Sequence, residues 1–226
     1  LLKELCKIAG LRWIRLLYCY PEEITEELIQ VMKEEKKICH YLDLPIQHAS
    51  DAVLKRMGRR TTKAEIKEMI AKLRKEIPDI CLRTTLITGF PGETKKQHEE
   101  LLEFIDEMEF DRLGVFTYSA EEDTPAAGMP DQIPEEVKEE RQAELMELQQ
   151  EIAFDNADEM VGKEVLVMVE GKVADENAYV GRTYRDAPNV DGLIFINTEE
   201  VLVSGDFAKV KVTGAIDYDL IGGLVE

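Results

Sequence analysis

Apolar residues recur along the first 120 residues in two alternating patterns. The first pattern is a nearly continuous, strand-like run of apolar residues. In the second, which lies between such runs, apolar residues recur at helical spacing with Glu-rich positions between them. Helices of this kind are expected around Ile24–Met32, after Thr62 and after Thr94, where the threonines are natural caps. Ser50 is expected to cap a further helix. Four nearly continuous apolar runs are typical of strands buried on both faces, namely residues 14–20, 38–44, 80–88 and 112–118.

Strands that alternate with helices of this length predict a parallel sheet. The fold class of the first part is therefore α/β, with about four strand–helix units. The pattern alone leaves open whether these units form part of a (β/α) barrel or an open sheet. In both arrangements the working site lies at the carboxyl ends of the strands.

The pattern changes after a loop rich in proline and glycine at 119–134 and a long charged helix at about 134–160. Short alternating strands with glycine, aspartate and asparagine between them predict a small all-β barrel of the OB-like kind. The expected domains are residues 1–157 and 158–226. The four expected strands of the second domain are residues 164–169, 178–184, 193–196 and 208–212.

The net charge of −19 changes the picture of possible partners. It opposes tight, nonspecific binding to nucleic acid and is compatible with a basic protein partner or simply with solubility. The sequence contains no apolar run of about 18 residues and no basic–apolar leader, so no membrane span and no secretion are expected. The four cysteines match no metal-binding spacing, which predicts a reduced, cytoplasmic protein with no metal ligands of its own.

Two segments at strand ends are candidates for binding. The first, LITGFPGET at 86–94, has two glycines that let the backbone approach a ligand, although a tight turn would have the same sequence. The second, LDLPIQHAS at 42–50, offers the hydrogen-bonding side chains of Gln47 and Ser50. His48 lies in the same segment and is a candidate base or ligand, although a single histidine without a metal partner is more often structural.

Two further features involve arginine. Arg83 lies in an otherwise apolar strand, so it must face a cavity or a partner. It fits either a ligand carboxylate, which a guanidinium binds in two places, or a structural salt bridge. In the second domain, a strand with Arg182, Tyr184 and Arg185 precedes a Pro-Asn loop, and this is either a recognition edge or a plain hairpin.

Together, five segments resemble the radical-SAM methylthiotransferases, and the C-terminal barrel resembles their TRAM domain. The resemblance implies that the strand–helix units of residues 1–157 are part of a (β/α) radical-SAM barrel. The family has a branch that modifies tRNA adenosine and a branch that modifies an aspartate of a small-subunit ribosomal protein, number twelve. The segment YRDAPNVDG at 184–192 and the acidic charge favour the second branch. The five segments occur in the family's order and are RLLYCYP at 15–21, LDLPIQHAS with VLKRMGR at 42–59, ITGFPGET at 87–94, FTYS at 116–119 and DTPAA at 123–127.

The resemblance implies a cofactor set and a mechanism. S-adenosylmethionine (SAM) is reduced by a four-iron four-sulfur cluster on a Cys-x3-Cys-x2-Cys motif, and the resulting 5′-deoxyadenosyl radical takes hydrogen from the substrate β-carbon. A second such cluster supplies the sulfur. Within this picture Arg83 is a candidate for the SAM carboxylate and the Gly89 segment for the adenine side. By motif position, the residues implied to line the SAM pocket are Gln47, Ser50, Arg83, Gly89 and Phe90, with Phe116 and Tyr118 at its rim; Arg182, Tyr184 and Arg185 are implied in partner recognition.

The sequence also departs from the family pattern, because it has no Cys-x3-Cys-x2-Cys motif. It also begins at Leu1 in what reads as the middle of a helix. We therefore expect a fragment of a longer protein that by itself holds no cluster and has no turnover, with the whole protein acting as a monomer on its ribosomal protein.

Two alternatives lie outside the family. A barrel enzyme of the aldolase or synthase type would need a lysine or paired carboxylates at strand ends, and Asp43 and Glu93 form no clear pair in the sequence. A non-catalytic RNA-binding module would need basic or aromatic strand faces, which the acidic charge and the few aromatic residues of the barrel oppose.

Overall fold

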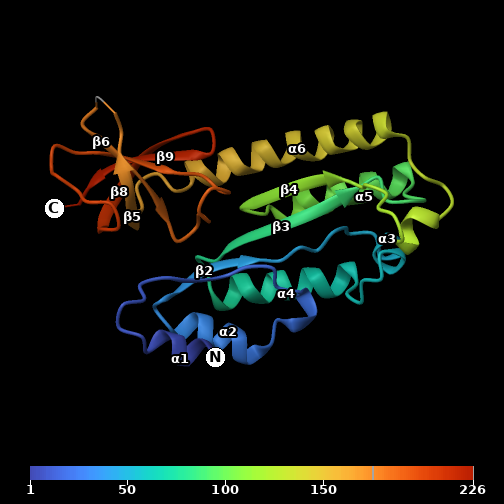
Figure 1. The fold of residues 1–226 in the computed structure, drawn as a ribbon, viewed down its shortest axis with the longest axis horizontal. Helices are drawn as coiled ribbons and strands as arrows, with labels where there is room; N and C mark the ends of the chain where they lie inside the picture. Colours follow the sequence, from blue (N-terminus) through green and yellow to red (C-terminus); the bar gives the residue numbers. More distant parts are fainter. Residues whose placement is uncertain (175, 226) are drawn as a thin grey trace. The chain divides into compact units, whose positions relative to one another are not determined.

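The structure, a computed structural model, describes residues 1–174 and 176–225, which form two compact units (Figure 1). The first unit comprises Leu1–Ile152 and the second Ala153–Glu226. Helix α6, Glu135–Asp158, begins in the first unit and ends in the second. The domain boundary expected at 157/158 stays a prediction.

The first unit is built on four parallel strands that follow one another in sequence order. This confirms the predicted α/β class with a parallel sheet. The strands are β1 (Ile14–Leu16), β2 (Ile38–Asp43), β3 (Cys81–Thr88) and β4 (Arg112–Thr117). The helices are α1 (Leu2–Cys6), α2 (Glu26–Glu34), α3 (Asp51–Arg56), α4 (Lys63–Glu76) and α5 (Lys95–Met108), with 3-10 turns at Pro21–Glu23 and Pro125–Gly128.

Strand β1 is shorter than predicted, and the expectation of a strand over 14–20 is wrong beyond Leu16. Tyr18 adopts a left-handed backbone conformation with φ of 57°, which a strand cannot accommodate. Its N–H donates to the Asp43 carboxylate at 3.0 Å, and the Cys19 N–H donates to the Asp43 carbonyl at 2.9 Å. The chain is therefore held against the end of β2 by the side chain and carbonyl of one aspartate.

Two of the predicted caps are complete capping boxes. Thr62 and Thr94 each accept a backbone N–H from the third residue of their helix, and Glu65 and Gln97 bond back to the capping residues. Ser50 is the N-cap residue of α3, as expected, but its side chain makes no capping bond. The buried ring of His48 instead accepts the N–H groups of Ala49 and Ser50, both at 2.9 Å.

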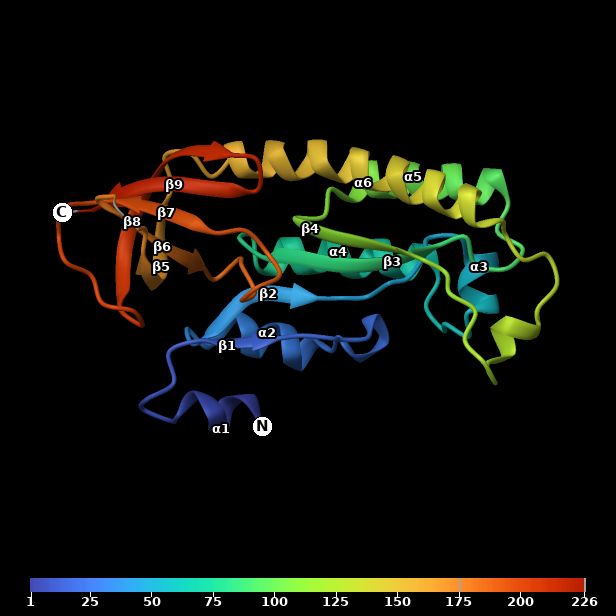
Figure 2. The same ribbon diagram turned by 45° about the horizontal axis from the view of Figure 1, so that its top comes forward.

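The apolar core of this unit lies between the sheet and helices α2, α4, α5 and α6 (Figure 2). On β3, Leu82 and Leu86 belong to this core, while the alternate residues Arg83, Thr85 and Ile87 are half-buried. This alternation is the period of two of a strand. The face of the sheet away from the helices therefore carries polar as well as apolar side chains.

Helix α6 also covers the edge of β4. Three of its side chains donate to backbone carbonyls along that edge: Lys138 to Tyr118 at 2.8 Å, Gln142 to Val115 at 2.6 Å, and Gln149 to Phe110 at 2.8 Å. Unpaired strand carbonyls at a sheet edge otherwise invite another strand to pair. The helix thereby occupies the edge of β4 with side-chain hydrogen bonds.

The second unit is a closed barrel in the order β5-β6-β7-β9-β8, with β7 and β9 parallel and the other pairs antiparallel. This confirms the predicted OB-like barrel. The last strand was not predicted, because glycines interrupt its apolar pattern. The strands are β5 (Glu164–Lys172), β6 (Ala178–Thr183), β7 (Ile194–Asn197), β8 (Phe207–Ile216) and β9 (Asp219–Leu224).

Two glycines of the barrel, Gly222 in β9 and Gly181 in β6, are required by the close approach of neighbouring strands. A Cβ at Gly222 would lie 2.6 Å from the Lys211 carbonyl oxygen, and a Cβ at Gly181 would lie 2.6 Å from the Met168 carbonyl oxygen. Neither distance is compatible with a side chain, so glycine is what lets these strands close the barrel. Over the described residues, no helix is long and apolar enough to span a membrane.

Candidate functional site

A cavity of about 650 Å³ lies where β2, β3 and β4 end, which is where a parallel sheet places its site. Its walls come from Gln47 after β2, from the turn after β3, and from the residues that follow β4. The remaining wall consists of α3 with the residues after it, and of the loop that the sequence showed at 119–134. The lining residues are Gln47, Arg56–Arg59, Ile87, Phe90, Phe116–Ser119, Glu121, Thr124–Ala126 and Met129.

Gln47 is held in an uncommon backbone conformation with φ of 73°. Its N–H donates to the Thr85 carbonyl at 3.0 Å, and its own carbonyl accepts the Ile87 N–H at 2.8 Å. These two bonds to β3 fix a conformation that costs a non-glycine residue free energy. Such strain is found where a side chain must be held in one place, and the Gln47 side chain lines the cavity.

Aromatic rings form the apolar part of the cavity. Phe90 and Tyr118 meet edge to face, with centroids 5.2 Å apart, and pack with Val53. Phe116 is 61% exposed although it lies in β4. The Tyr118 hydroxyl is buried and has no hydrogen-bond partner among the described residues, whereas buried hydroxyl groups usually have one.

The turn after β3 is organised by one buried carboxylate. Glu93 accepts the N–H of Gly89 at 2.7 Å and that of Phe90 at 3.3 Å, and it pairs with Arg141 of α6 at 2.9 Å. Burial alone would raise the pKa of Glu93, but the His48 side chain, the Arg141 charge and the Gly89 N–H outweigh it and lower the pKa below its ordinary value. Glu93 is therefore held as a carboxylate beneath the cavity.

Gly89 shows why this turn needs glycine. Its φ is +72°, and a Cβ there would lie 2.3 Å from Cγ of Lys138 on α6. A side chain would be strained by the backbone and would displace Lys138, whose ammonium group is fixed by the Tyr118 carbonyl. The turn is thus packed directly against α6.

Of the seven residues predicted for the SAM pocket, Gln47, Phe90, Phe116 and Tyr118 line the cavity. Ser50, Arg83 and Gly89 are not among its lining residues. Ser50 is buried behind it, and Gly89 lies against Lys138. The contacts of all seven with SAM stay predictions.

Arg83 makes the salt bridge that the sequence left open as an alternative. Its guanidinium lies 2.9 Å from the carboxylate of Asp43, which is buried on the neighbouring strand. The same carboxylate holds the Tyr18 N–H. Arg83 therefore fixes the end of β1 to β2 and β3 through Asp43, and its predicted contact with the SAM carboxylate remains untested.

The residues predicted for partner recognition lie around a structured turn of the barrel. The Asp186 carboxylate accepts both the N–H and the hydroxyl of Thr183, at 3.1 and 2.6 Å, and the Thr183 hydroxyl oxygen accepts the Arg185 N–H at 3.0 Å. Arg182 pairs with Glu170 of β5 at 2.7 Å. The turn that carries Tyr184 and Arg185 is thus held by its own side chains, which is compatible with a preformed recognition edge.

The structure adds residues that sequence reasoning missed. Lys138 and Arg141 support the site, and they are the only basic residues of α6. Two cations three positions apart on one face of a strongly acidic helix were a usable signal. Arg56 and Arg59 also line the cavity. In the sequence they lie within a segment that resembles the family, and nothing marked either residue as part of a site.

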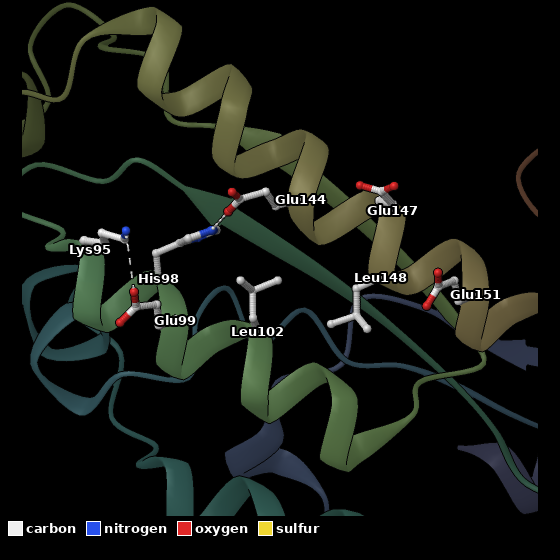
Figure 3. A pocket seen from close by; sticks show the side chains of 8 residues that line it. All are labelled: Lys95, His98, Glu99, Leu102, Glu144, Glu147, Leu148 and Glu151. Atoms are coloured by element: carbon white, nitrogen blue, oxygen red, sulfur yellow. Dashed lines mark hydrogen bonds and ion pairs between the residues drawn. The ribbon is translucent and has the colours of Figure 1, made fainter.

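A second cavity, of about 470 Å³, lies between α5 and α6 (Figure 3). His98 bonds Glu144 across it at 2.6 Å, and Leu102 and Leu148 form its apolar part. Glu99, Glu147 and Glu151 add negative charge around it. It contains none of the residues that the sequence predicted for a site.

Comparison with known proteins assigns families to both units. Residues 1–105 match the radical SAM superfamily, and residues 161–225 match the TRAM domain. The chain is also similar to a solved structure of coproporphyrinogen III oxidase from Escherichia coli, a radical SAM enzyme. The match covers 67% of this chain and 34% of the oxidase, at 19% identity and a TM-score of 0.49.

Relatives with a curated name match almost the whole chain. The chain is 64% identical over 222 residues to "Ribosomal protein uS12 methylthiotransferase RimO" of Lachnoclostridium phytofermentans, covering 98% of the chain and 50% of that protein. It is 51% identical over 226 residues to the protein of the same name from Desulfitobacterium hafniense, covering 100% and 51%. The chain spans about half the length of these relatives. With a radical SAM match, a TRAM match and these relatives, the chain belongs to the radical-SAM methylthiotransferase family.

Proposed function

We propose that this chain is the SAM-binding and TRAM-carrying part of a longer enzyme, which adds a methylthio group to the β-carbon of an aspartate in ribosomal protein uS12. The observation that carries the proposal is the 64% identity over 222 residues to a relative with that named substrate. Because the chain spans half of that relative, the activity is assigned to the longer protein. Residues 1–157 are proposed as its radical-SAM part and 158–226 as its TRAM domain.

The cavity at the strand ends is the proposed place for SAM. Its volume lies within the range of small-molecule sites, roughly 300–1,000 Å³. Phe90, Phe116 and Tyr118 offer aromatic surface to the adenine, and the buried Tyr118 hydroxyl lacks a partner that a polar ligand atom would provide. The residues present therefore fit the cofactor.

Around that cavity each residue has a proposed task. Gln47 and Phe90 hold the cofactor from two sides, and Gly89 lets the backbone come close. Ser50 and Arg83 are proposed to contact the cofactor although neither is among the lining residues. Phe116 and Tyr118 close the rim and exclude water. When bound beside a reduced iron–sulfur cluster, SAM supplies the radical that removes hydrogen from the substrate carbon.

The iron–sulfur clusters do not fit this chain. Within residues 1–174 and 176–225, no three histidine, cysteine or acidic side chains are placed to hold a metal, and Cys39 and Cys81 are buried in the core. We propose that both four-iron four-sulfur clusters are bound by another part of the longer protein. Iron and sulfide analysis of this chain after anaerobic reconstitution tests this, because a stoichiometric cluster would contradict it.

The partner is proposed to be a basic protein, since the net charge of −19 favours encounter with cations and opposes binding to nucleic acid. Arg182, Tyr184 and Arg185 are proposed to contact it. The longer protein is proposed to work in the cytoplasm as a monomer.

The decisive experiment offers two substrates to the reconstituted longer protein, with SAM and a reductant under anaerobic conditions. Mass spectrometry would detect a methylthio group as about +46 Da, a shift set by the cofactor chemistry. We expect it on an aspartate of uS12 and not on tRNA. Addition to tRNA adenosine would move the chain to the other branch of the family, and the reaction without SAM is the control.

A further inference from the structure

His48 is buried at the junction of the two loops that form opposite walls of the cavity. It follows Gln47 directly, and its ring lies beneath the turn that contains Gly89 and Phe90. The sequence alone made it a structural histidine or a base. Its contacts define a more specific role, which rests on the proposed function.

The hydrogen bonds of the ring determine its protonation. Nδ1 accepts two backbone N–H groups, from Ala49 and from Ser50, each at 2.9 Å. A nitrogen that accepts hydrogen bonds cannot carry a proton. The neutral ring therefore has its proton on Nε2, so the backbone after Gln47 selects the tautomer.

The Nε2–H points to the carboxylate that organises the opposite wall. It lies 3.6 Å from Oε2 of Glu93, and both side chains are fully buried. This distance is longer than a hydrogen bond of good geometry, and Nε2 has no other partner among the described residues. A buried N–H without a partner is unfavourable, so a small approach of the two loops is favoured.

The same carboxylate oxygen of Glu93 connects to the cavity wall. Oε2 accepts the N–H groups of Gly89 and Phe90, and Arg141 pairs with Oε1. One chain of contacts thus runs from the backbone after Gln47 through His48 and Glu93 to Phe90. The residues at its two ends both line the cavity.

We propose that His48, as the Nε2–H tautomer, is a positioning residue that sets Gln47 and Phe90 at the spacing that SAM requires. It does not touch the cofactor. It fixes one wall through Nδ1 and reaches the other through Nε2–H and Glu93, so both nitrogens are needed at once.

Two conservative variants separate the nitrogens. In His48→Asn the amide oxygen replaces the Nδ1 acceptor but cannot reach Glu93. In His48→Gln the amide N–H reaches toward Glu93, but the N–H groups of Ala49 and Ser50 lose their acceptor. His40→Asn is the matched control, since His40 is a half-buried histidine of β2 that bonds Asp79 on the surface.

The experiment measures SAM binding to the reconstituted longer protein by equilibrium dialysis. We expect each His48 variant to weaken binding roughly tenfold, a coupling of the usual size between linked elements, with His40→Asn unchanged. Glu93→Gln should also weaken SAM binding. The double variant His48→Asn with Glu93→Gln should lose no more affinity than either single variant, because the two residues act through one contact. Wild-type SAM binding by either His48 variant, or additive losses in the double variant, would overturn the proposal.

Two further measurements keep folding and function apart. Fluorescence of Trp13 shows whether each variant is folded, and SAM binding is compared under conditions below the unfolding transition of every variant. Nitrogen-15 NMR of histidine-labelled protein before cluster loading, assigned by the signal lost in His48→Asn, reports the tautomer directly, and a proton on Nδ1 would overturn the proposal. If the wild type binds no SAM, the proposed function fails instead, whatever the tautomer.

Discussion

Two histidine–glutamate pairs in the first unit differ in a way that their distances do not reveal. His98 bonds Glu144 at 2.6 Å across the cavity between α5 and α6, whereas His48 lies 3.6 Å from Glu93. Yet the Glu144 side chain is 50% exposed, and that of Glu93 is fully buried. Water can replace the first contact and cannot replace the second.

The carboxylates of Glu93 and Glu144 also differ in the number of bonds that they make. Glu93 holds two backbone N–H groups and an arginine from another element, while Glu144 bonds His98. A buried carboxylate with several donors is therefore a junction between elements, and the shorter pair is a contact between two helices in which only the histidine is buried. The following predictions test that distinction.

The largest effect is expected for Glu93→Ala. It leaves Arg141 and the Gly89 N–H buried without their partner, and breaking a buried ion pair costs about 3–5 kcal/mol of unfolding free energy. Urea unfolding followed by Trp13 fluorescence measures this, because the single tryptophan lies in the first unit. The control is Glu103→Ala on the exposed face of α5, and a loss as small as the control's would contradict the junction.

A smaller loss is expected for Gly89→Ala. The substituted residue keeps a left-handed φ and its Cβ meets Lys138, so the unfolding free energy should fall by about 2 kcal/mol. Gly10→Ala is the control, since its Cβ would meet nothing within 4 Å. Equal stability of the two variants would show that the turn does not pack against α6.

The pH dependence of the unfolding free energy tests the role of Glu93 in a second way. Because the pKa of Glu93 is lowered in the folded protein, its contribution to stability is present above the unfolded pKa and is lost as the pH falls through the folded pKa. The stability gap between wild type and Glu93→Gln should therefore narrow as the pH falls from about 5 toward 3. Urea midpoints at each pH measure it, and a gap that stays constant would be evidence against the lowered pKa.

The smallest effect is expected for Glu144→Gln. Half of this side chain is exposed, and exposed pairs contribute about 0–1 kcal/mol. The loss in urea unfolding should lie in that range and shrink in added salt. A loss as large as that of Glu93→Ala would remove the distinction between the two pairs.

Most of the fold followed from periodicity, since the strands at 38–44, 80–88 and 112–118 and the capped helices are local patterns. The failures involve contacts distant in sequence. The end of β1 depends on Asp43, and β9 carries glycines because Lys211 approaches it closely. Neither partner is visible to a pattern within one segment.

The site shows the same limit. Gln47, Phe90, Phe116 and Tyr118 lie at strand ends, where sequence reasoning places a site, and they do line one cavity. The pairing of Arg83 with Asp43 depends on the register of β2 and β3. The support from α6 depends on a helix some 50 residues beyond the turn, and no spacing rule connects them.

The two capping boxes bear on how the chain folds. Parallel strands form slowly, because each pairing must first close a long crossover. Thr62 with Glu65, and Thr94 with Gln97, stabilise the starts of the two crossover helices on either side of β3 through contacts only three residues apart. Those helices can begin to form before the sheet exists, which shortens the search for β2–β3 and β3–β4 pairing. The same hydrogen bonds that cap the starts of these helices in the native state thus favour the order in which the sheet assembles.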